Sequence, residues 1–217
     1  MILSLRHNYI YIRTKKTGSS TIEWLLTQNL GPEDIVVGKD LHCLGPLLKP
    51  GVRVPKLRVP PTHVAADQIK PLLRDDFWNG AFKFTSERHP YEKAVSLAYW
   101  RLERMGKTGR HKQQDKVSSN FGEYLDELVR SGKYSTFRYY SIDGEPAVDD
   151  FIRLESLKTD LERIAHRIGI TIPDELPRKR GESRVDRRPA KEILSAEQKD
   201  IVWENCRREF EILGYER

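Results

Sequence analysis

The sequence predicts an α/β fold with a central, mainly parallel sheet flanked by helices. Two short apolar runs, residues 9–12 and 81–85, have the length and composition of buried strands. Each run passes through a polar turn into an amphipathic stretch, which is the order expected of parallel strands joined by helices. With 217 residues the chain suits one domain of this kind, so we expect residues 1–217 to form a single domain.

Composition narrows the classes of function. Charged residues make up 32% of the chain and hydrophobic residues 38%, and no apolar run approaches the length of a membrane span. No signal peptide is visible, and the two cysteines, Cys43 and Cys206, are too few for a disulfide framework or a Cys-rich zinc site. We therefore expect a cytoplasmic protein without an integral membrane segment. The net charge of +6 favours an anionic ligand, whether nucleotide, nucleic acid, membrane surface or acidic glycan.

The first strand–helix junction has the composition of an anion-binding loop. Glycine lets the backbone approach an anion closely, and the first amides of a helix carry about half an elementary positive charge. Lysines and hydroxyls add charge and donors. A capping box formed by Ser20 and Glu23 is the alternative, but it leaves the lysines and the glycine unexplained. The predicted loop residues are Lys15, Lys16, Thr17, Gly18, Ser19, Ser20 and Thr21.

The second junction places an arginine directly after a buried strand. Pro90 is suited to the first position of a helix, so Arg88 should stand at the carboxyl end of the strand, where α/β sheets bind ligands. Ser96 follows on the helix and faces the same way. A guanidinium and a hydroxyl together suit a phosphate group. The alternatives are a surface salt bridge from Arg88 to Glu87 or Glu92 and a solvated hydroxyl at Ser96.

The remaining segments are assigned from the spacing of their apolar residues and from residues that favour turns. Helices are expected at about 20–30, at 65–78 with an interruption at Pro71, from Pro90 onward, and at 120–131, 158–169 and 196–213. Residues 31–62 should form a long irregular connection with one short strand. Residues 139–143 and 149–154 should form a strand pair, or a strand, a loop and a strand, around a turn.

His63 stands just before a predicted helix. The positive end of a helix disfavours protonation, and a neutral imidazole can act as a base. From the residues alone, a hydrogen bond between this histidine and the backbone at the helix start is the preferred interpretation. His42 and Cys43 do not amount to a metal site, and no other metal-ligand set is expected.

Both junctions resemble motifs of the sulfotransferases that use 3′-phosphoadenosine 5′-phosphosulfate. Their 5′-phosphosulfate loops look like P-K-S-G-T-T or P-K-T-A-G-T-S, which puts the family lysine on Lys16 and Lys15 in place of the proline. The nucleoside-triphosphatase loop differs, because its lysine follows its second glycine. The motif R-x-P-x-x-R-x-x-S, which holds the 3′-phosphate, is similar to Arg88 through Ser96, with Lys93 where an arginine is common.

The segments HVAADQIK and FKFTSERHP resemble the branch that includes the heparan sulfate uronyl 2-O-sulfotransferases. In that branch a His-Val precedes the arginine motif, so the resemblance implies that His63 is the catalytic base, with Glu23 as the second candidate. The basic loop at 176–189 matches one that closes over the adenine and 3′-phosphate, which implies nucleotide contacts from Ser183 and Arg184.

The resemblance implies a P-loop-type three-layer fold and transfer of a sulfuryl group to an acceptor hydroxyl, with a glycan as the expected acceptor. Lys16 would stabilise the leaving phosphate, although Lys15 stays open as the catalytic lysine, and neither a metal nor a nucleic acid is required. The acceptor wall is expected from residues 31–62 and 105–118. Two other classes stay open: a magnesium-dependent nucleotide kinase-like enzyme, and a basic nucleic-acid-binding module without catalysis.

Overall fold

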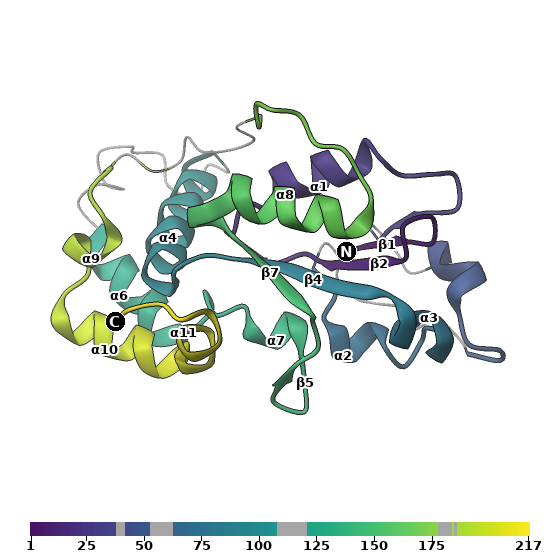
Figure 1. The fold of residues 1–217 in the computed structure, drawn as a ribbon. Coiled ribbons are helices and arrows are strands. Elements are labelled where there is room, and N and C mark those ends of the chain that lie inside the picture. Colours follow the sequence, from purple (N-terminus) through teal and green to yellow (C-terminus); the bar gives the residue numbers. More distant parts are fainter. Residues whose placement is uncertain (38–41, 53–62, 108–120, 178–183, 185) are drawn as a thin grey trace. The chain divides into compact units, whose positions relative to one another are not determined.

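The computed structural model describes residues 1–37, 42–52, 63–107, 121–177, 184 and 186–217 (Figure 1). The chain divides into two compact units. The first comprises Met1–Glu87 with Arg138–Pro177, and the second Arg88–Phe137 with Arg178–Arg217. The first unit contains a sheet and helices, and the described part of the second contains helices. The single domain expected for residues 1–217 stays a prediction.

The first unit is built on a five-stranded sheet, which confirms the predicted α/β class, but the sheet is mixed rather than mainly parallel. Its strand order is β3-β1-β2-β4-β7. β2 pairs with β4 and β4 with β7 in parallel, whereas β1 is antiparallel to both of its neighbours (Figure 1). All four residues of β2 are buried, as expected of a strand covered on both faces. The strands are β1 (Ile2–Ser4), β2 (Tyr9–Ile12), β3 (Ile35–Val36), β4 (Phe82–Glu87) and β7 (Asp150–Arg153).

Two helices pack on the sheet of the first unit. Ile22 and Leu25 of α1 and Ile164 of α8 share one apolar cluster with Tyr11 and Phe84 of the strands. The break between α2 and α3 confirms the interruption expected near the proline of this segment. The helices are α1 (Ser19–Thr27), α2 (Ala66–Ile69), α3 (Asp75–Gly80), α7 (Phe137–Tyr140) and α8 (Leu157–Ile168), with 3₁₀ turns η1 (His42–Leu47) and η2 (Leu154–Ser156).

Strands occur within both predicted stretches, 139–143 and 149–154, but they do not pair with each other. α7 occupies the start of this stretch, and a small hairpin of β5 (Ser141–Ile142) and β6 (Glu145–Pro146) follows. Asp143 and Gly144 both have positive φ, the geometry of a two-residue turn that joins β5 to β6. β7 instead joins the main sheet beside β4.

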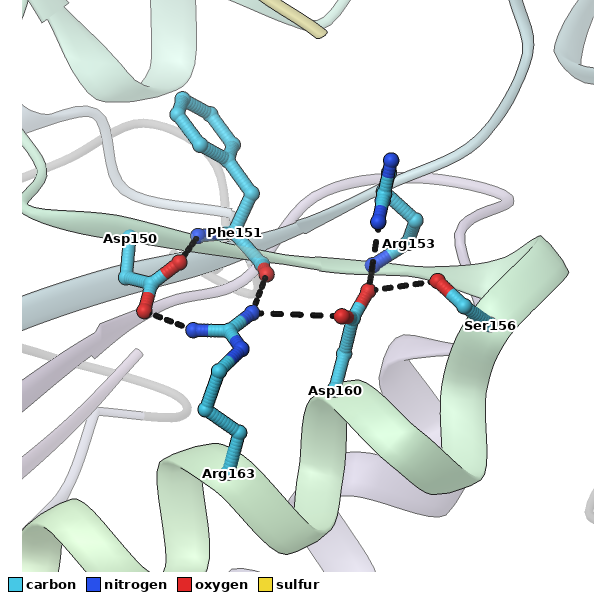
Figure 2. A network of polar contacts seen from close by, with 6 residues as sticks. All are labelled: Asp150, Phe151, Arg153, Ser156, Asp160 and Arg163. Atoms are coloured by element: carbon cyan, nitrogen blue, oxygen red, sulfur yellow. Dashed lines mark hydrogen bonds and ion pairs between the residues drawn. The ribbon is translucent and has the colours of Figure 1, made fainter.

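A carboxylate network fixes the connection from β7 to α8 (Figure 2). Asp160 is 4% exposed and accepts hydrogen bonds from the Arg153 amide at 2.9 Å and the Ser156 hydroxyl at 2.7 Å. Arg163 joins it at 3.2 Å and also donates to the Phe151 carbonyl at 3.1 Å (Figure 2). Burial raises the pKa of Asp160, but these donors outweigh it and lower that pKa below its ordinary value. The network therefore fixes the turn that begins η2.

The second unit packs its helices around a separate apolar cluster. Val95, Leu128, Val202 and Phe210 lie in it together with Cys206, which is fully buried. The single helix predicted at 196–213 is wrong: the backbone leaves helical geometry at Cys206, with φ −124°. Because of this break, the helices before and after Cys206 each pack a side chain, Val202 and Phe210, into the same apolar cluster. The helices are α4 (Pro90–Lys107), α6 (Phe121–Ser131), α9 (Ala190–Ile193), α10 (Ala196–Asn205) and α11 (Arg207–Leu213).

Candidate functional site

Hydroxyl groups tie the predicted anion-binding loop to the carboxyl end of β4. The Thr14 and Thr17 hydroxyl oxygens lie 2.9 Å apart, and Thr14 also donates to the Ser86 carbonyl. The Ser86 hydroxyl lies 2.8 Å from that of Thr17 and 3.0 Å from that of Tyr11. The loop is thus anchored where two neighbouring parallel strands end. Because the Thr17 side chain is fully buried here, only its main chain is left for the predicted ligand contact.

The backbone of the loop turns through the left-handed region twice. Gly18 is the N-cap of α1 with φ 77°, and Lys16 has φ 63°. A Cβ on Gly18 would lie 2.7 Å from Cδ1 of Leu154, so that side chain would have to move, and the positive φ itself favours glycine. A lysine in this region costs conformational energy, and such strain is concentrated at functional sites.

The capping box considered for Ser20 and Glu23 is absent. α1 begins at Ser19, and among the described residues no side chain caps it. Glu23 forms a salt bridge of 2.8 Å with Arg13, which also donates to the Ser20 hydroxyl at 3.3 Å. The first amides of α1 are therefore not taken up by a side-chain cap, which is the condition for anion binding at a helix start.

The two other hydroxyls of the predicted loop are mostly enclosed. Ser19 and Thr21 are each 6% exposed, and Thr21 donates to the Pro177 carbonyl at 3.2 Å. Their contribution to a ligand would again come mainly from the backbone. The sequence predicted the loop correctly as a strand-to-helix turn, but it did not indicate which hydroxyls face the interior.

His63 is hydrogen-bonded to this loop from a distant part of the chain. Its Nδ1 lies 3.1 Å from the Arg13 carbonyl oxygen, which can only accept, so Nδ1 carries the hydrogen and Nε2 the lone pair. Burial lowers the pKa of His63 to about 4, and the charges of Arg13, Lys15 and the terminal amine add to this effect against the opposing carbonyl contact. At neutral pH the imidazole is in the form that a general base needs.

Lys15 points to a tyrosine that sequence reasoning missed. Its Nζ stands 5.3 Å from the ring centroid of Tyr139, and the His63 ring lies 5.9 Å from the same ring. Arg138 donates to the Tyr139 hydroxyl at 2.9 Å. Tyr139 falls in a stretch predicted as a strand, and no motif or spacing connects it to the loop. Lys15, His63 and Tyr139 thus form one cluster within the first unit.

In the second unit, one carboxylate brings together the two arginines predicted to bind a phosphate. Oε2 of Glu92 accepts from Arg88 at 2.8 Å and from Arg184 at 2.6 Å, while Oε1 accepts from the Ala190 amide at 2.7 Å. Burial raises the pKa of Glu92, but these three donors outweigh it and lower that pKa. The salt bridge from Arg88 to Glu92, weighed as the alternative for Arg88, is therefore present.

Three further residues belong to the segments that were compared with phosphate-binding motifs: Ser96, Lys93 and Ser183. Ser96 is half-buried on α4, one turn beyond Glu92. Lys93 is fully buried, 2.7 Å from the Thr136 hydroxyl and 3.5 Å from the Glu209 carboxylate, so it is a core residue rather than a phosphate ligand. Ser183 lies outside the described residues.

Lys16 belongs to the first compact unit and Arg88 to the second, so a nucleotide pocket formed by both stays a prediction. In the chain, Arg88 follows Ser86, the anchor of the loop, by two residues.

The described residues contain no helix that is both long and apolar enough to cross a membrane. In the same part of the chain, no cluster of three or more His, Cys, Asp or Glu side chains has the arrangement of a metal site. Compared with protein-family models, curated proteins and solved structures, the chain matches none of them.

Proposed function

We propose that the protein is a cytoplasmic sulfotransferase that moves a sulfuryl group from 3′-phosphoadenosine 5′-phosphosulfate to an acceptor hydroxyl, with a glycan as the acceptor class. The proposal includes a P-loop-type three-layer arrangement and no requirement for a metal or for nucleic acid. The observation that carries it is the hydrogen bond between His63 and the backbone of Arg13. It places the candidate base at the lysine-rich loop, although the two were identified from separate motifs.

The reaction would proceed by in-line displacement. The sulfur–oxygen bond to the 5′-phosphate breaks as a bond to the acceptor oxygen forms, and Nε2 of His63 takes the acceptor proton. Lys16 and the first amides of α1 would stabilise the negative charge that grows on the leaving phosphate oxygen. Arg88, Ser96, Ser183 and Arg184 would hold the 3′-phosphate.

Calorimetry with product nucleotides tests this function. Adenosine 3′,5′-bisphosphate should bind at least about tenfold more tightly than ADP, because charge-assisted hydrogen bonds to the 3′-phosphate contribute about 1.5–3 kcal/mol. Magnesium should not be required. Equal affinity for ADP, or binding only with magnesium, would instead support a kinase-like enzyme. Steeply salt-dependent binding to DNA or RNA without nucleotide preference would support a nucleic-acid-binding module.

Substitution of the two cationic ligands should have different effects. Lys16→Ala should lower turnover by about 10²–10³-fold, since its charge is needed most in the transition state, and should weaken donor binding less. Arg88→Ala should mainly raise the dissociation constant of the donor. Steady-state kinetics and calorimetry measure both. Arg130→Ala, which removes a surface arginine whose side chain is 59% exposed, is the control and should change neither quantity. The same loss in kcat for Lys16→Ala and Arg88→Ala would contradict the division of roles.

A further inference from the structure

Two cations meet on the buried phenol of Tyr139. The residue is 6% exposed, its oxygen accepts a hydrogen bond from Arg138 at 2.9 Å, and the Lys15 ammonium lies against the same side chain and adds its charge. The Arg138 guanidinium carbon lies 4.8 Å from the ring centroid, and Lys15 Nζ lies 5.3 Å from it. Burial raises the pKa of Tyr139, but the two donors and their charges outweigh it and lower that pKa. Both cations therefore stabilise negative charge on the phenol oxygen.

His63 packs against the same ring, with an angle of 51° between the two ring planes. The charged groups that act on the imidazole are the Arg13 guanidinium, the Lys15 ammonium and the terminal amine, and all three are positive. Arg13 is held by its salt bridge to Glu23. Lys15 is held by Tyr139, so Tyr139 controls one of the charges next to the candidate base.

We propose that Tyr139 is a positioning residue whose hydroxyl holds the Lys15 ammonium beside His63. The two adjacent lysines of the loop then have separate tasks: Lys15 adds to the burial that keeps the imidazole neutral, and Lys16 is the lysine for the leaving phosphate. The inference rests on the proposed function, because the role of His63 as a base comes from that proposal. The contacts themselves need no ligand, so they can be tested in the free protein.

The test is an NMR titration of the His63 Cε1 proton in the ligand-free protein. The wild-type midpoint is expected near pH 4. Tyr139→Phe keeps the ring but releases Lys15, and Lys15→Met removes the charge; each should raise the midpoint by about half a pH unit or more. Lys16→Met removes the same charge from the next residue and is the matched control, which should leave the midpoint at its wild-type position.

The double variant Tyr139→Phe/Lys15→Met should titrate like Lys15→Met alone, because both changes act through one contact. A wild-type midpoint in Tyr139→Phe, or an equal rise in Lys16→Met, would overturn the inference. If Tyr139→Phe does not fold, the comparison of Lys15→Met with Lys16→Met still decides whether Lys15 acts on His63. Loss of the expected nucleotide preference in calorimetry would refute the proposed function but leave this titration readable, so the two failures are distinguishable.

Discussion

Replacing His63 with alanine should lower kcat for sulfuryl transfer by about 10²–10⁴-fold, the usual contribution of a general base. The dissociation constant of adenosine 3′,5′-bisphosphate should stay nearly unchanged, because Nε2 is assigned to the acceptor proton rather than to the donor. Kinetics with radiolabelled donor and calorimetry measure the two effects. His166→Ala removes an exposed histidine of α8 and is the matched control. Intact turnover in His63→Ala would exclude this histidine and leave Glu23 as the candidate base.

The pH dependence of activity and stability, compared between the wild-type protein and His63→Ala, adds a second measurement. With a folded-state pKa of about 4, His63 is neutral at neutral pH, so the acidic limb of the rate profile should lie well below the ordinary histidine value of 6.5. The sign for stability is the same as for a paired carboxylate, because in both cases the folded-state pKa lies below that of the unfolded chain. The unfolded chain binds a proton at this position below about pH 6.5 and the folded protein only near pH 4, so acidification in this window favours unfolding. His63→Ala should lose this component of acid destabilisation, which urea titrations at several pH values would show.

Local chemistry made the two main junctions predictable. The run at residues 9–12 and the one that begins at Ala81 are continuous apolar segments bounded by polar turns, and Pro90 marks the helix start where α4 begins. The sequence did not predict β1, because a strand of three residues is too short to show a hydrophobic period. The break at Cys206 was missed because the residues on both sides keep a helical pattern while the backbone bends to serve one core.

The candidate site was predictable only where its chemistry lies close together in sequence. Gly18 and the lysines form one continuous loop, so their composition alone indicated an anion site. His63 gained its assignment from a resemblance, and its contact with Arg13 depends on long-range packing. Tyr139 and Glu92 were not predicted as site residues, because a tyrosine on a short helix and a glutamate on a long one are ordinary until the tertiary structure surrounds them with cations.

The second large effect concerns stability. Glu209→Ala should lower the free energy of unfolding by about 3–5 kcal/mol, because it removes a buried carboxylate from beside the fully buried Lys93 ammonium. The carboxylate, 1% exposed, also accepts from the Ser135 hydroxyl at 2.7 Å and from the Thr136 amide at 3.1 Å. Urea denaturation at pH 7 measures the loss. Arg130→Ala, which breaks an exposed ion pair, should cost less than about 1 kcal/mol and is the control.

A double variant can show why Glu209→Ala loses stability. If the cost of Glu209→Ala comes from an uncompensated buried charge, then the double variant Lys93→Met/Glu209→Leu should be more stable than the single alanine variant, because it removes both charges and refills the space. Burial raises the pKa of Glu209, but Lys93 and the hydrogen-bond donors outweigh it and lower that pKa. The carboxylate therefore stabilises the fold above the pKa of an unfolded glutamate, and this stabilisation is lost as the pH falls through the folded-state pKa. A double variant as unstable as Glu209→Ala would mean that the hydrogen bonds to residues 135–137, and not the ion pair, hold α11 in place.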